Sequence, residues 1–184
     1  ASLDATTGGA LVFGTGGTAI AGNASLDAGG PVGQSGALDV GGDATLRAGS
    51  QPVTLADSTN RVGGLFKLTT TGNASIAGHF GDGEFNTGAL EFGQTRVDRL
   101  TKVTAGGPVT QIGALTFSGA STLDAGTNGI TLADAHNDFV GPLSVTGGAT
   151  TLRDANDLTV ALTTGATTLT TGGSLNVSGS AASL

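Results

Sequence analysis

The chain of 184 residues contains no cysteine, methionine, tryptophan or tyrosine, and its seven aromatic residues are all phenylalanine. The lack of cysteine excludes a disulfide scaffold, a thiolate metal site and a thiol nucleophile. Only seven lysine and arginine residues stand against 14 aspartate and glutamate residues, which argues against nucleic acid, heparin or anionic lipid as a partner. No run of about 18 apolar residues is present, so the sequence predicts no membrane-spanning segment.

Glycine, in contrast, is abundant, with 34 residues, but it lacks the every-third-residue spacing that collagen requires. The hydrophobic content of 38% and the mean hydropathy of +0.18 are too high for a disordered chain. No window keeps the apolar stripe of an amphipathic helix over three turns. The composition therefore favours an ordered repeat protein without helices.

Residues 29–69 and 106–146 are copies of one another, because they align without a gap and are identical at 20 of 41 positions. Since the pattern is already under way at Ala1, we expect one rod-like domain over residues 1–184 that is a fragment of a larger protein. Within it, apolar-x-apolar triplets recur at nearly regular steps. They begin at Leu11, Leu38, Phe66, Leu90, Leu115, Leu143 and Leu169. Three steps, as from Phe66 to Leu143, equal the offset between the two copies.

Each step holds three segments of three to five residues that alternate apolar and polar side chains, with Gly, Asn, Asp and Ser between them. This pattern predicts an all-β fold: a right-handed parallel β-helix (solenoid) of about seven coils of ~26 residues, with three short strands per coil. If the triplets stack, Asp39, Lys67 and Glu91 form one outward column. Phe92 and Phe117 then occupy the same inward position in successive coils.

The stretch ITLADAHNDFVGPLSVTGGATTLRDANDLTV, residues 130–160, resembles the repeats of filamentous-haemagglutinin-type exoproteins, the adhesins of bacterial two-partner secretion. The resemblance implies a β-helical rod, secreted or displayed on the bacterial cell surface, that adheres to a host or neighbouring cell or presents other domains. The Asn-Pro-Asn motifs that the family's outer-membrane transporter reads are absent. The resemblance therefore implies export through a region outside this fragment. Autotransporter passenger rods have a similar composition and remain an alternative parent.

The candidate chemical groups are sparse and scattered. His79 and His136 fall at different corners of different coils, so the sequence predicts no metal site. The acidic turns Gly81–Glu84 and Asp134–Asp138 lack the tandem repeat of calcium-binding β-helices. Asn60 and Asn137 hold equivalent positions in the two copies, where we expect each to cap a turn. The sequence thus predicts no catalytic, cofactor-binding or metal-binding residue, and no enzyme, and it does not identify the ligand.

Two other functions occur on β-helices and remain alternatives, namely polysaccharide processing and ice binding. For the first, Asp98 and Asp124 are expected to be neighbours, but Arg153 would pair with Asp124 in the next coil. For the second, the expected outward column is interrupted by arginine: Thr45, Ser75, Arg96, Thr122, Thr151. We expect the longest loops, where an adhesin would bind its receptor, at residues 77–88 and 133–142. Open coils at the two ends predict end-to-end self-association.

Overall fold

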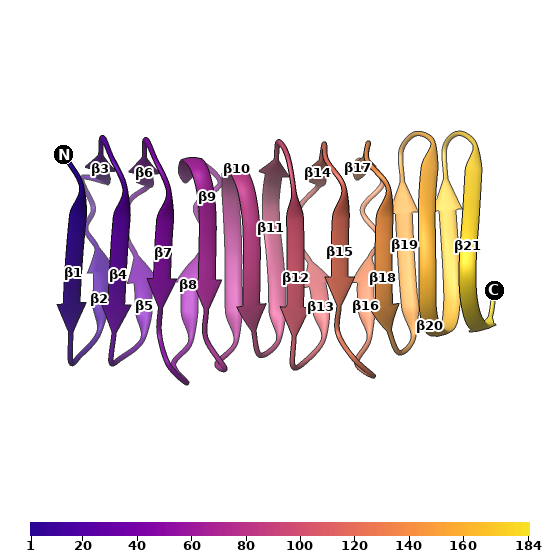
Figure 1. Ribbon diagram of the computed structural model, residues 1–184, viewed down its shortest axis with the longest axis horizontal. Coiled ribbons are helices and arrows are strands. Elements are labelled where there is room, and N and C mark those ends of the chain that lie inside the picture. Colours follow the sequence, from indigo (N-terminus) through magenta and orange to yellow (C-terminus); the bar gives the residue numbers. More distant parts are fainter.

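The computed structural model describes residues 1–184 and consists of 21 β-strands joined by turns, with no helix. Every strand pairing is parallel and joins one coil to the next. In Figure 1 the near strands run downward, the distant strands run upward, and the chain advances from the N-terminus at the left to the C-terminus at the right. This winding is right-handed. The structure therefore confirms a right-handed parallel β-helix, which forms about 9 turns.

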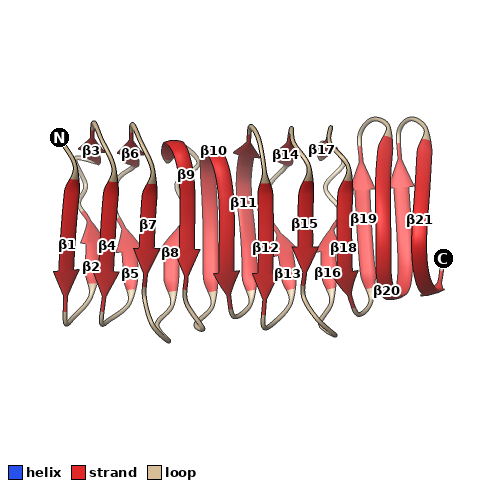
Figure 2. Cartoon of the chain, viewed as in Figure 1, coloured by secondary structure: helices blue, strands red, loops and turns tan.

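The coils have three faces, which we number in chain order. Face 1 contains β1 (Leu3–Thr7), β4 (Ala24–Ala28), β7 (Ala44–Arg47), the end of β9 (Arg61–Thr69), the end of β10 (Ala74–Thr87), β12 (Thr101–Ala105), β15 (Ser121–Asp124), β18 (Leu143–Gly147), the first half of β20 (Leu158–Thr171) and β21 (Leu175–Ser183). Figure 2 shows these strands as the front row of the rod.

Face 2 contains β2 (Leu11–Phe13), β5 (Val32–Gln34), β8 (Val53–Leu55), the start of β10, the start of β11 (Leu90–Val97), β13 (Val109–Gln111), β16 (Ile130–Leu132), β19 (Thr150–Asp154) and the end of β20. Face 3 contains β3 (Thr18–Ile20), β6 (Leu38–Val40), the start of β9, the middle of β10, the end of β11, β14 (Leu115–Phe117) and β17 (Asp138–Phe139). Beyond β17, a turn at residues 155–157 replaces the third strand.

The coils are shorter than the sequence predicted, and they differ in length. From Ala24, the stacked positions on face 1 are Ala44, Phe66, Gly83 and Thr101. The four coils from Ala24 to Thr101 together equal the offset between the two sequence copies. The prediction of about seven coils of ~26 residues is therefore wrong, although the fold class is right.

The error has a simple geometric cause. The triplet at Leu38 lies on face 3, the triplet at Phe66 on face 1 and the triplet at Leu90 on face 2. Each step between triplets is thus one coil plus one face, and three such steps make four coils. The periodicity detected in the sequence is one and a third coils, because all three faces use the same apolar-x-apolar pattern.

The predicted charge column is wrong for the same reason. Asp39 lies on face 3 beside Arg61, and Glu91 lies on face 2 between Ser75 and Thr110. Lys67 lies on face 1, where its Nζ is 3.3 Å from Glu84 Oε2 in the next coil. Opposite charges of neighbouring coils therefore do pair on face 1, but the pair is Lys67 with Glu84 and does not include Asp39 or Glu91.

The interior is a continuous core of 39 buried apolar residues along the rod. Six phenylalanine rings form an unbroken series of contacts with centroid separations from 5.0 to 6.2 Å: Phe66, Phe80, Phe85, Phe92, Phe117 and Phe139. Phe92 and Phe117 are both fully buried, with centroids 5.9 Å apart. They project from faces 2 and 3 and meet across the core, so the prediction of one shared position is wrong.

The expected loops are also revised. Residues 77–88 are not a loop, because β10 continues through the corners of its coil as one strand up to Thr87. Residues 133–142 contain the turn that precedes β17 and then β17 itself. The structure has no helix that is long and apolar enough to cross a membrane.

Candidate functional site

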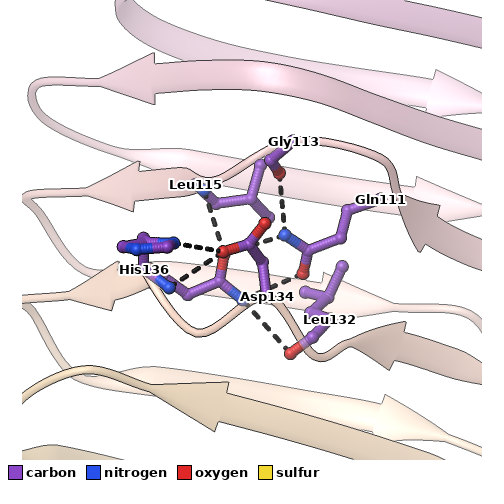
Figure 3. A network of polar contacts seen from close by, with 7 residues as sticks. Gln111, Gly113, Leu115, Leu132, Asp134 and His136 are labelled. Carbon is purple, nitrogen blue, oxygen red and sulfur yellow. Dashed lines mark hydrogen bonds and ion pairs between the residues drawn. The ribbon is translucent and has the colours of Figure 1, made fainter.

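The most elaborate polar cluster lies at the corner between faces 2 and 3 in the coil of β16 and β17 (Figure 3). Asn137, at the end of the turn, is 0% exposed. Its Oδ1 accepts the backbone N–H of Leu115 at 3.0 Å and Gln111 Nε2 at 2.8 Å, and its Nδ2 donates to Gln111 Oε1 at 2.9 Å and to the carbonyl of Leu132 at 3.2 Å. An amide has both the donor and the acceptor that a corner leaves unpaired, so asparagine performs the predicted capping role.

The same cluster exists four coils earlier. Asn60 Oδ1 accepts hydrogen bonds from the N–H of Leu38 at 2.8 Å and from Gln34 Nε2 at 2.9 Å. Asn60 Nδ2 donates a hydrogen bond of 2.9 Å to Gln34 Oε1. Nδ2 also donates to the carbonyls of Leu55 and Ala77. The glutamines, which sequence reasoning missed, are recognisable because Gln34 and Gln111 also hold equivalent positions in the two copies.

On the outer side of each cluster an aspartate orders the turn. Asp134 Oδ1 accepts the backbone N–H of His136 at 2.9 Å and lies 3.1 Å from its Nδ1. The His136 N–H, followed by the ring, lowers the pKa of Asp134. In the other copy, the hydroxyl and then the N–H of Thr59 lower the pKa of Asp57. A cavity of about 250 Å³ beside the turn is lined by Gln111, Ile112, Thr131, Ala133 and Asp134.

A second group of charges lies on face 3, where Arg61, His79 and Arg96 stack in successive coils. Asp98 Oδ2 is 2.8 Å from His79 Nε2, and Asp98 Oδ1 accepts Arg96 Nε at 2.8 Å. The Arg96 guanidinium, with a smaller effect from His79, lowers the pKa of Asp98. The group forms exposed ion pairs.

The two histidines lie apart, each beside its own aspartate, and no group of three or more His, Cys, Asp or Glu side chains has the arrangement of a metal site. In the acidic turn of residues 81–84, Asp82 binds Arg99 at 2.7 Å and caps the N–H of Leu100 at 2.9 Å. The Arg99 hydrogen bond lowers the pKa of Asp82.

The predicted carboxylate pair does not form. Asp98 lies at the corner after face 3, whereas Asp124 lies on face 1 between Thr104 and Thr146. Arg153 lies on face 2 and stacks on Thr170, so it does not pair with Asp124. These residues were expected to be neighbours because the repeat detected in the sequence spans one and a third coils, which aligns residues that lie on different faces.

The predicted threonine column is wrong for the same reason, but a different one exists. The outward positions of the central residue on face 2 stack in the order Thr54, Ser75, Glu91, Thr110, Thr131, Thr151 and Thr168. The last four coils therefore present four threonines in line, without an arginine between them. Parallel strands place their side chains about 4.8 Å apart along this column.

Asp154 is the one buried carboxylate, at 2% exposure. Its Oδ1 accepts the N–H of Phe139 at 3.2 Å and thereby caps the last strand of face 3. Its Oδ2 is buried without a hydrogen-bond partner. Burial, together with the nearby charge of Asp138, raises the pKa of Asp154.

The fold, a stack of repeated coils, defines a β-solenoid repeat protein. Residues 1–69 and 71–146 match a family model described as repeats of unknown function, DUF5649, and the chain belongs to that family. No curated protein and no solved structure matches the chain.

Proposed function

We propose that the chain is a structural and adhesive rod segment of a large secreted bacterial surface exoprotein. The observation that carries the proposal is the continuous core of 39 residues, which joins the coils from Phe13 to Leu162 into one rod. The four-coil unit is duplicated so that equivalent residues of the two copies lie on the same face. Adding such units lengthens a solenoid without changing the contacts between neighbouring coils. A protein built in this way is suited to hold other domains, or its own surface, at a distance.

The resemblance of residues 130–160 to filamentous-haemagglutinin-type repeats supports the secreted, cell-surface location and the adhesive role. Membership of a family of repeats supports a modular rod but assigns no location or ligand. The partner that this proposal implies is a host or neighbouring-cell surface, bound either by the rod or by a domain that the rod presents.

The proposal is tested in the parent protein by deleting residues 39–115, which joins Leu38 to Thr116. These junction residues lie on face 3, so the deletion removes four whole coils and keeps every column in register. The rod should shorten by about 19 Å. Measurements would be small-angle scattering of the purified protein, surface labelling of intact cells and cell-adhesion assays.

The outcomes separate the two roles. A stalk keeps its adhesion after the deletion, with reduced reach, whereas an adhesive segment loses binding in proportion to the coils removed. A matched variant that duplicates residues 39–115 should have the opposite effect on length. Detection of the parent protein only inside cells, with no surface labelling, would contradict the proposal.

A further inference from the structure

The three faces differ sharply in charge. Outward positions in the strands of face 1 carry seven charged residues: Asp4, Asp27, Arg47, Lys67, Glu84, Lys102 and Asp124. The outer side of face 2, over nine strands, carries only Glu91 and Arg153. A protein surface normally mixes charges, so a long face with only two of them is a candidate interaction surface.

The side chains that replace the charges on face 2 are small. Around the threonine column, the outward neighbours on one side are Pro108, Gly129, Ala149 and Ala166. Glycine, alanine and threonine let a second β-sheet approach to about 10 Å or less. On this side of the column the face carries no bulky side chain, so a second sheet can approach it closely.

We propose that face 2 is the interface of a homodimer in which two copies pack face to face with antiparallel rod axes. The two charges select this arrangement. Glu91 lies in the coil of β11 and Arg153 three coils later, in β19. A two-fold axis between the coils of Thr110 and Thr131 brings Glu91 of each copy over the coil that carries the partner's Arg153.

A parallel, in-register dimer would instead place Glu91 opposite the partner's Glu91, and like charges across an interface oppose association. In the antiparallel arrangement both Glu91–Arg153 pairs form, and Thr110 of one copy faces Thr131 of the other. Arginine is long enough to cover the two-residue lateral offset, since its side chain extends along the surface.

The area supports a weak dimer. Six coils overlap, and their face-2 strand segments of three to five residues give roughly 300–480 Å² on each copy at the standard spacings. The total of roughly 600–950 Å² falls in the range of weak, transient interfaces. We therefore expect a reversible dimer whose population rises with protein concentration.

The test measures association by sedimentation velocity for two matched substitutions in one coil. Thr131→Arg places a charge on face 2, whereas Thr122→Arg places the same charge on the exposed outer side of face 1. We expect Thr131→Arg to weaken association at least about tenfold and Thr122→Arg to leave it unchanged. Circular dichroism verifies that both variants are folded.

A charge exchange tests the register. Glu91→Arg should weaken association, because it would face the partner's Arg153, and the double variant Glu91→Arg/Arg153→Glu should restore it. The chain has no cysteine, so single cysteines can be cross-linked selectively. A mixture of Thr110→Cys and Thr131→Cys should cross-link through a short bismaleimide, and Thr54→Cys alone should not.

Three results would overturn the proposal. The first is a monomer at every concentration; thermal hysteresis in such a monomer, lost in Thr131→Arg, would assign the face to ice. The second is association that Thr131→Arg leaves intact, which would point to the ends of the rod. The third is a failure of the double variant to restore association, or efficient cross-linking of Thr54→Cys, which would exclude the antiparallel register.

Discussion

Asn137 and Gln111 face one another across adjacent coils, with their amides joined by two hydrogen bonds of 2.8 and 2.9 Å. Neither amide could be replaced by an apolar residue without leaving polar groups of the corner unpaired. Asn137 also binds the N–H of Leu115 and the carbonyl of Leu132. The pair is thus a clamp between the strands of successive coils at the corner of faces 2 and 3.

Asn137→Ala should therefore lower the free energy of unfolding by at least about 2 kcal/mol, because it removes the partner of the buried N–H of Leu115 and of the buried carbonyl of Leu132. Asn60→Ala should have a similar effect, and the two losses should add because the sites lie about four coils apart. Urea denaturation measures both. Asn86→Ala, at an exposed position, is the matched control and should change stability by less than about 0.5 kcal/mol. Equal effects of Asn137→Ala and the control would contradict the clamp.

The clamp was only partly predictable from the sequence. The duplication identified Asn60 and Asn137 as equivalent, and the preference of asparagine for turns indicated a cap. The glutamine partners lie 26 residues away in the chain, in the preceding coil. Locating them requires the true coil length, which was hidden because strands of all three faces share one apolar pattern.

The fold class, in contrast, was predictable, because alternation within short segments and turn residues between them are properties of each strand alone. Which strand stacks on which is a property of the whole coil. Coils of unequal length, such as those from Ala44 to Phe66 and from Phe66 to Gly83, give no constant period. Every expectation about which residues share one column therefore failed, including the Asp98–Asp124 pair. The threonine column on face 2 was not predicted, because it too depends on which strands stack.

Asp154 should give the protein an unusual pH dependence. Because its pKa is raised in the folded state, the folded protein binds the proton more tightly than the unfolded chain does. Its contribution to stability is therefore greatest below the unfolded pKa, about 3.9, and falls as pH rises through the raised folded value. The aspartates with lowered pKa values, such as Asp82, have the opposite sign and lose their contribution as pH falls.

The change that isolates this group is Asp154→Asn, which keeps an oxygen for the N–H of Phe139 and removes the charge. We expect the free energy of unfolding of Asp154→Asn, relative to that of the wild type, to increase as pH is raised from 4 towards 8. The increase should be about 1.4 kcal/mol for each unit by which folding raises the pKa of Asp154. Urea midpoints at several pH values measure this difference. Asp157→Asn, at an exposed position, is the control. A difference that stays constant with pH would contradict a raised pKa.

The phenylalanine series should be a main source of stability in the middle of the rod. Phe117 is fully buried and contacts the rings of Phe92 at 5.9 Å and Phe139 at 5.6 Å. Phe117→Ala should reduce the free energy of unfolding by about 3–5 kcal/mol, since it removes the ring and leaves a cavity. Phe117→Leu should be considerably milder. A loss below about 1 kcal/mol for alanine, measured in urea, would show that the core does not close around this position.

Successive coils approach closely at the corner where β9 turns from face 3 to face 1. A Cβ added at Gly63 would lie 2.6 Å from the carbonyl oxygen of Gly41 in the preceding coil, and that backbone cannot move without disturbing the coil stack. Gly33, at an outward position of face 2, has nothing within 4 Å of such a Cβ. Neither glycine has a positive φ, so alanine is not strained by the backbone angle at either place.

Gly63→Ala should therefore destabilise the protein by about 1–3 kcal/mol through steric overlap. Gly33→Ala should instead be neutral or stabilise it by about 0.4–1 kcal/mol, because alanine restricts the unfolded chain without adding a clash. Thermal and urea unfolding of the two variants measure the contrast. The same glycine-to-alanine substitution then changes the free energy of unfolding in opposite directions at two outward strand positions. Only the close stacking of coils at the corner distinguishes the two positions. If both variants had the same stability, the corner would be looser than the contact between Gly63 and Gly41 requires.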